Sequence, residues 1–197
     1  MRASTQREHV AGPAGRIEVA IDRPEGAARG AALIAHPHPL FGGTLDNKVV
    51  QTLARAFVEL GYEAWRPNFR GVGESEGKYD EGNGELEDLL CVYGRLNHPG
   101  IVLAGFSFGG AMAARLSARV KSERVALVAP AVGNFPAPNV PPGTLVIHGE
   151  ADETVPLADV LAWARPQELP VLVVPGAEHF FHRKLHVLRA AIESNWK

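Results

Sequence analysis

The sequence has only one cysteine, Cys91, so no disulfide can form within the chain. It has no apolar run of roughly 18 residues, the length at which a membrane-spanning helix becomes a candidate. Residues 1–15 also lack the apolar segment of a secretory signal. From these absences we expect a cytoplasmic protein of a reducing compartment, without a membrane partner.

An excess of charge of one sign is also missing. The sequence has 20 Lys and Arg against 22 Asp and Glu, which gives a net charge of −2. A nucleic-acid-binding surface carries a strong basic excess, so this balance argues against a nucleic-acid partner. The 197 residues suffice for one hydrophobic core and hardly for two. Because no linker, repeat or low-complexity segment interrupts the chain, we predict a single domain over residues 1–197.

What the sequence does contain is an alternation of short apolar runs with amphipathic segments. REHVAGPAGRIEVAID predicts two antiparallel strands joined by a turn at residues 12–15, and runs such as GAALIAH predict strands buried on both faces. Apolar residues at helical spacing predict helices near 49–60, 86–96, 108–120, 156–165 and 181–192. The alternation predicts an α/β fold with a mostly parallel central sheet, an N-terminal antiparallel hairpin and flanking helices.

The segment GFSFGG lies where an apolar strand gives way to a helix rich in small residues. It contains Gly105-x-Ser107-x-Gly109, the pattern of a nucleophile elbow. In such an elbow the serine occupies a strained strand-to-helix turn, and glycines provide the room that side chains would fill. An incidental serine in a glycine-rich turn is the alternative, and the rest of the chain decides between them.

A serine hydroxyl needs a base to accept its proton, and the base needs an acid to orient it. After an elbow of this kind the acid and then the histidine follow along the chain. Asp152 lies in HGEADETVP after one predicted strand, and His179 lies in VVPGAEHFF after the last. The carboxyl ends of parallel strands share one edge of a sheet, so Ser107, Asp152 and His179 are predicted to meet there. Asp159 and Glu178 are alternative acids.

With AHPHPLFGG, NFRGVGES, GFSFGG, HGEADETVP and GAEHFF in place, the chain resembles the α/β-hydrolase family over nearly its whole length. It is most similar to small lid-free bacterial serine hydrolases of the dienelactone-hydrolase-like and carboxylesterase branch. The resemblance implies an α/β-hydrolase fold without a large lid domain, with Ser107 as nucleophile, Asp152 as acid and His179 as base. Dienelactone hydrolases proper use cysteine as nucleophile, and the serine here argues against a dienelactone substrate.

Acyl transfer also needs two N–H donors for the oxyanion, one from the residue after the nucleophile and one from the loop after the third strand. The first is Phe108. The second comes from HPHPLFGG, where Pro37 and Pro39 have no N–H. Leu40 is the preferred candidate, followed by His38. A purely structural loop is the alternative.

Other patterns suggest other ligands. GVGESEG, at residues 71–77, nearly matches a dinucleotide-binding fingerprint but has its third glycine one position late, and we expect this loop to border the site instead. His36 and His38 lack a third ligand nearby, so no metal site and no cofactor are predicted. His182 and His186, four apart on the predicted last helix, are interpreted as solvated or capping residues, and His148 as a structural residue whose hydrogen bonds are satisfied.

The sequence therefore predicts an enzyme, a serine hydrolase that cleaves a small carboxylic ester through an acyl-enzyme intermediate. A thioesterase or peptidase would use the same residues. A binding module that retains the fold without catalysis is the alternative from another class. The partner is a small-molecule ester, and the sequence does not determine the oligomeric state.

Overall fold

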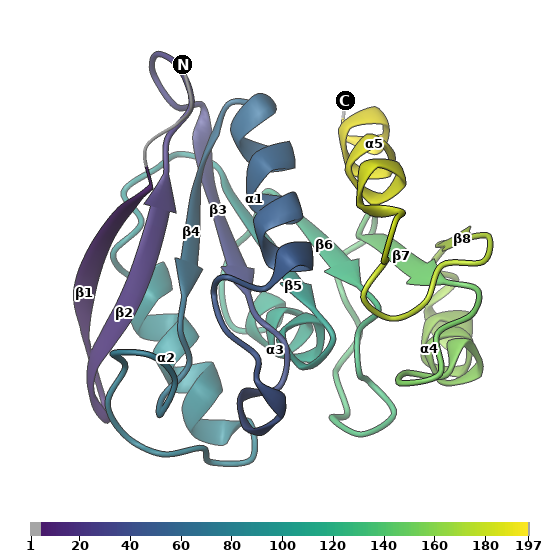
Figure 1. The fold of residues 1–197 in the computed structure, drawn as a ribbon, viewed down its shortest axis with the longest axis horizontal. Helices are drawn as coiled ribbons and strands as arrows, with labels where there is room; N and C mark the ends of the chain where they lie inside the picture. The colour runs from purple at the N-terminus through teal and green to yellow at the C-terminus, as the bar shows by residue number, and fades with distance from the viewer. Residues whose placement is uncertain (1–4, 197) are drawn as a thin grey trace.

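The computed structural model describes residues 5–196, which form a twisted eight-stranded sheet with helices on both faces (Figure 1). The strand order is β1-β2-β4-β3-β5-β6-β7-β8. The first pairings, β1 with β2 and β2 with β4, are antiparallel, and all later pairings are parallel. The strands are β1 (Gln6–Gly12), β2 (Gly15–Asp22), β3 (Gly30–Ala35), β4 (Tyr62–Pro67), β5 (Ile101–Phe106), β6 (Arg124–Val128), β7 (Leu145–Gly149) and β8 (Val171–Val174).

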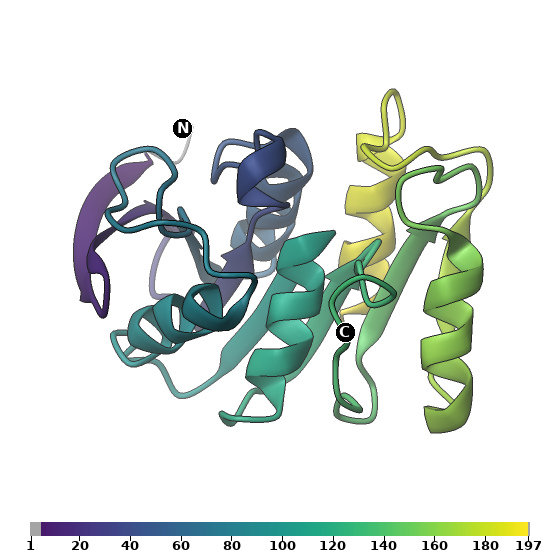
Figure 2. The ribbon, with the colours of Figure 1, turned by 90° about the horizontal axis from the view of Figure 1, so that it is seen from below.

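The helices divide between the two faces of the sheet, as Figure 2 shows. On one face lie α1 (Lys48–Glu59) and α5 (Leu185–Asn195), and their apolar residues belong to one buried cluster. The second cluster lies under α2 (Asn83–Tyr93), α3 (Phe108–Ser117) and α4 (Leu157–Ala164) on the other face. Two short 3₁₀ turns, η1 (Pro39–Phe41) and η2 (Arg165–Gln167), complete the elements. The predicted fold class is therefore confirmed, including the N-terminal hairpin.

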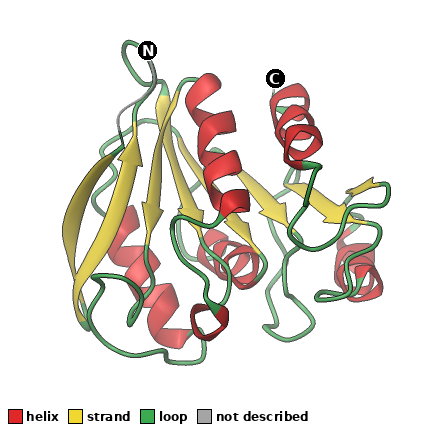
Figure 3. Ribbon diagram, in the orientation of Figure 1, coloured by secondary structure: helices red, strands yellow, loops and turns green. Residues whose placement is uncertain are grey.

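The central strands are buried on both faces because helices cover both. All six residues of β3 and all six of β4 are buried, as the continuous apolar run of β3 predicts. The loops after β3, β5 and β7 emerge at the carboxyl edge of the parallel part of the sheet (Figure 3). That edge is where open α/β sheets bind their ligands. No described helix is long and apolar enough to cross a membrane.

The last helix begins later than its apolar spacing predicts. It starts at Leu185, so Phe181 and His182 lie in the preceding turn, where Phe181 has a φ of 51°. Phe181 is nevertheless fully buried. The periodicity identified a buried side chain correctly, but a tight turn rather than a helix brings it into the core. As a result, His182 and His186 do not share a helix.

Candidate active site

Ser107 occupies the turn between β5 and α3, with a φ of 57° and a ψ of −120°. This conformation is strained for a residue with a side chain, by roughly 1–3 kcal/mol. The surrounding backbone holds it in place: Ser107 N–H donates to Val128 O at 3.0 Å, and Ser107 O accepts from Ala111 N–H and Ala131 N–H. Such strain at a buried serine is typical of a functional turn.

Two glycines make this turn possible by allowing close backbone contacts. A Cβ on Gly105 would lie 2.1 Å from the carbonyl oxygen of Gly109. One on Gly109 would lie 2.3 Å from Ala35 O and 2.4 Å from His36 O. All three distances are too short for any side chain, so the end of β3 and the start of α3 can meet only through glycine.

His179 lies between Ser107 and Asp152, and a continuous chain of hydrogen bonds joins the three. Its Nδ1 is 2.7 Å from Asp152 Oδ2, and its Nε2 is 3.1 Å from Ser107 Oγ. A carboxylate only accepts, so Nδ1 carries the proton and, in the neutral ring, Nε2 is free to accept from the serine hydroxyl. Three residues from three different loops thus meet at the carboxyl edge of the sheet, as their order in the sequence predicts.

The Asp152 carboxylate is oriented by the turn that follows it. Its Oδ1 accepts from Thr154 N–H at 2.9 Å and from Val155 N–H at 2.8 Å, which leaves Oδ2 for His179. Burial by itself raises the pKa of Asp152, but the hydrogen bonds from His179 and from the two backbone N–H groups outweigh it, so the pKa lies below its usual value. The carboxylate is therefore ionised at neutral pH.

The other two acids do not take this place. Glu178 pairs with His182 at the surface, and Asp159 is an exposed residue in the first turn of α4. Aromatic rings enclose the His179 imidazole instead: the Phe106 ring lies 4.7 Å from it and the half-exposed Phe180 ring 5.0 Å from it. These contacts limit the movement of the ring that joins acid and serine.

His36, the first histidine of the loop after β3, is a structural residue. Its Nδ1 donates to Pro37 O at 2.6 Å, and its Nε2 accepts from Phe69 N–H at 3.0 Å. Burial lowers its pKa to about 4, so the ring is neutral at physiological pH. Both ring nitrogens are used, which leaves none for a metal ion. Among residues 5–196, no group of three or more His, Cys, Asp or Glu side chains is placed to hold one.

His38 organises the rest of the loop through its side chain. Its Nδ1 accepts from Leu40 N–H at 3.2 Å, so its Nε2 donates to the Tyr79 hydroxyl at 3.1 Å. Burial lowers the pKa of His38, which favours this neutral form. Its ring also packs 5.0 Å from the ring of Phe108, the residue after the serine. Sequence reasoning missed Tyr79, because no local pattern indicates a contact across 41 residues.

These bonds determine which backbone N–H groups of the loop are available. Leu40 N–H donates to the His38 ring, and the N–H groups of Phe41 and Gly43 both donate to His38 O at 3.1 Å. Neither His38 N–H nor Phe108 N–H, by contrast, takes part in the hydrogen bonds found between loops and turns of the described residues, and the first N–H groups of a helix such as α3 have no partner within it. The preference for Leu40 in the sequence therefore has a structural argument against it, and His38 becomes the stronger candidate.

The loop at residues 71–77 follows β4 and leads into Tyr79, and that it borders the mouth of the site stays a prediction. It packs on the β1–β2 hairpin, where the buried Glu18 carboxylate accepts from Glu74 N–H at 2.9 Å and from Asn68 Nδ2 at 2.7 Å. A Cβ on Gly73 would lie 2.4 Å from Glu18 Oε2 and 2.4 Å from Asn68 Nδ2. No helix follows the loop directly, since α2 begins at Asn83. Its glycines thus serve close packing, and the next segment, with Tyr79, reaches the site.

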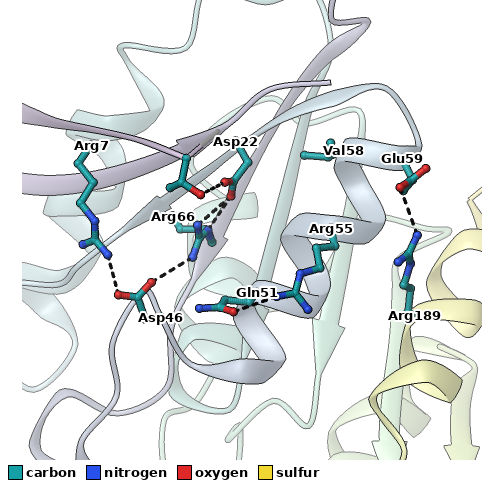
Figure 4. A pocket seen from close by; sticks show the side chains of 10 residues that line it. Arg7, Asp22, Asp46, Gln51, Arg55, Val58, Glu59, Arg66 and Arg189 are labelled. Atoms are coloured by element: carbon teal, nitrogen blue, oxygen red, sulfur yellow. Dashed lines mark hydrogen bonds and ion pairs between the residues drawn. The ribbon is translucent and has the colours of Figure 1, made fainter. Parts of the chain in front are cut away.

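A cavity of about 780 Å³ lies away from the serine, between the β1–β2–β4 edge, α1 and α5 (Figure 4). Its arginines are mostly paired: Arg66 with Asp22 at 2.8 Å, Arg7 with Asp46 at 2.7 Å and Arg189 with Glu59 at 3.5 Å. Arg66 also donates to Leu45 O at 2.7 Å and so fixes the segment between η1 and α1. These contacts support the packing of the sheet edge against α1 and α5 around the cavity.

Comparison with known proteins gives consistent matches. A profile described as "Alpha/beta hydrolase family" matches residues 32–143. An uncharacterized protein of Rickettsia prowazekii is 33% identical over 201 residues, covering 92% of this chain and 84% of that protein.

Two solved structures are similar over nearly the full chain. One, of an alpha-beta serine hydrolase homologue from Coxiella burnetii, is 40% identical with a TM-score of 0.88, and the match covers 98% of this chain and 97% of that chain. Another, of a lid-free a/b serine hydrolase from Xanthomonas campestris, is 37% identical with a TM-score of 0.90 and covers 99% and 94%.

Proposed function

This chain belongs to the alpha/beta hydrolase family, and we propose that it is a serine hydrolase that cleaves a small carboxylic ester through an acyl-enzyme intermediate. The observation that carries the proposal is the unbroken hydrogen-bonded chain from Ser107 Oγ through His179 to Asp152 Oδ2. A binding module would not need all three side chains in this order, whereas acyl transfer does.

In the proposed reaction His179 Nε2 takes the Ser107 proton as Oγ attacks the ester carbonyl. The tetrahedral intermediate then collapses: the bond to the alcohol oxygen breaks, and the imidazolium returns its proton to the leaving alcohol. Water, deprotonated by the same nitrogen, attacks the acyl-serine and releases the acid. Asp152 keeps the proton on Nδ1 and stabilises the imidazolium throughout.

The oxyanion of each intermediate is proposed to accept from Phe108 N–H and His38 N–H. Neither takes part in the hydrogen bonds found between loops and turns of the described residues, while Leu40 N–H is bonded to the His38 ring. Phe108 also opens α3, whose N-terminal dipole favours negative charge. Losing one such donor costs about 100- to 1,000-fold in turnover in other hydrolases.

The substrate is proposed to be small or well exposed, because the chain between β6 and β7 forms only a loop where a lid domain could be inserted. A series of p-nitrophenyl esters with increasing acyl length, alongside acyl-CoA and peptide substrates, tests this. We expect the short esters to react fastest. Activity that rises through long acyl chains would contradict a small substrate, and preferred cleavage of acyl-CoA or peptide would favour a thioesterase or peptidase.

Labelling by a fluorophosphonate probe tests the proposed nucleophile directly. We expect the native protein to be labelled, Ser107→Ala to be unlabelled and His179→Ala to be labelled much more slowly. Circular dichroism and thermal unfolding of each variant control for folding. A folded native protein that resists labelling would overturn the hydrolase proposal and favour the binding module.

A further inference from the structure

A second histidine, His148, lies behind the acid of the proposed triad, near the end of β7. It is fully buried, and its Nε2 is 3.0 Å from Val155 O. A carbonyl oxygen only accepts, so Nε2 carries the proton. Burial lowers the pKa of His148, which keeps the ring neutral and its Nδ1 unprotonated. In the described residues, this Nδ1 is the one buried side-chain nitrogen or oxygen without a hydrogen-bond partner.

The protonated nitrogen of His148 also faces the catalytic carboxylate. It lies 3.6 Å from Asp152 Oδ2, the same oxygen that accepts from His179 Nδ1 at 2.7 Å. Two titratable groups act electrostatically on His148: Asp152, from the β7–α4 loop, and His179, from the β8–α5 loop. The positive end of the His148 N–H dipole is therefore directed between Val155 O and the charge on Asp152.

An unpartnered nitrogen in the interior is unfavourable, and an apolar side chain of similar size would avoid it. What the imidazole supplies instead is the Nε2–H group. Through Val155 O this group anchors the turn of residues 152–155, whose N–H groups hold Asp152 Oδ1. The sequence interpretation of His148 as a satisfied structural residue is thus only half correct.

We infer that His148 is a positioning residue for the Asp152–His179 pair: its Nε2–H anchors the 152–155 turn and offsets part of the negative charge that Asp152 presents to His179. The catalytic consequence rests on the proposed function. Without this N–H the less compensated carboxylate would hold the imidazolium more tightly. His179 would then keep its proton to higher pH, and the acid limb of the pH profile would move upward.

The test compares His148→Leu with His148→Gln, whose amide nitrogen can occupy the place of Nε2. For His148→Leu we expect the midpoint of the acid limb of the kcat/KM profile, measured with a short p-nitrophenyl ester, to shift to higher pH by roughly half a unit. We also expect kcat/KM at pH 7 to fall on the order of 10-fold. His148→Gln is expected to restore most of both values. Thermal unfolding shows whether each variant is folded, and His148→Asn, which is too short to reach Val155 O, replaces Leu if that variant does not fold.

A second readout does not depend on activity. Titration of the His179 imidazole by ¹⁵N NMR, assigned through His179→Ala, reports the pH at which this ring protonates in each variant. An upward shift in His148→Leu that His148→Gln reverses supports the inference. The inference is overturned if the pH at which His179 protonates does not change in His148→Leu. It is also overturned if that pH falls because the hydrogen bond between Asp152 and His179 is lost. If the native protein hydrolyses no ester, the proposed function fails while the NMR titration still decides the role of His148.

Discussion

His36 Nε2 accepts a 3.0 Å hydrogen bond from the backbone N–H of Phe69, and this contact ties the loop after β3 to the loop after β4. The same ring donates through Nδ1 to Pro37 O. Because a protonated ring could not accept from Phe69, the native fold requires His36 to be neutral. The hydrogen bond thus makes the stability of the site depend on pH.

The pH dependence follows from the pKa of His36, which burial lowers from 6.5 to about 4. Between these values the unfolded chain binds a proton that the native state does not. The unfolding free energy therefore falls as the pH decreases from 6.5 to 4, by about 3 kcal/mol in all from this residue. Urea unfolding of the native protein and of His36→Gln across this range measures it. We expect a flatter profile for the variant, and parallel profiles would contradict this role.

The elbow is expected not to tolerate a methyl group at residue 109. In Gly109→Ala the new Cβ would lie 2.3 Å from Ala35 O, a backbone atom that cannot move without displacing β3. We expect a loss of at least about 3 kcal/mol of stability, or failure to fold. Gly94→Ala is the matched control: its nearest contacts are 3.5 Å away and its φ is −63°, so stability should change by less than about 1 kcal/mol. Equal thermal midpoints for the two variants would refute the packing argument.

Asp152→Asn should separate catalysis from folding. The amide oxygen can still accept from Thr154 N–H and Val155 N–H, so the turn should survive. The variant loses the negative charge that fixes the His179 tautomer, and we expect kcat to fall about 10⁴-fold. Asp159→Asn, on the exposed start of α4, should retain full activity. If Asp159→Asn were the inactive variant, the acid would have been misassigned.

Tyr79→Phe removes the hydroxyl that accepts from His38 Nε2 and leaves the ring packing unchanged. If His38 N–H serves the oxyanion, a less constrained loop should lower kcat about 2- to 10-fold with little change in KM, in line with the loss of one neutral hydrogen bond. Tyr93→Phe, which removes an exposed hydrogen bond to Lys121 O, is the control. Steady-state kinetics that are identical for both variants would argue against this role for Tyr79.

The sequence by itself determined the order of the elements and the layered architecture. Continuous apolar runs code for strands covered on both faces, and spacing of three to four residues codes for helices with one buried face. Gly105, Ser107 and Gly109 between such a strand and such a helix indicate an elbow. Because parallel strands share one carboxyl edge, the sequence also predicts that Asp152 and His179 lie near Ser107, and in the structure His179 is within hydrogen-bonding distance of both Ser107 and Asp152.

Only the tertiary structure decided how the polar groups pair across the fold. In the η1 turn the N–H of Leu40 donates to the His38 ring. That ring in turn is hydrogen-bonded to the hydroxyl of Tyr79, 41 residues further along the chain. The unpartnered Nδ1 of His148 likewise depends on what surrounds β7 in space. Periodicity and turn residues report local burial and backbone conformation. Hydrogen bonds between distant segments depend on side-chain rotamers and on how loops meet, and these are fixed only when the chain folds.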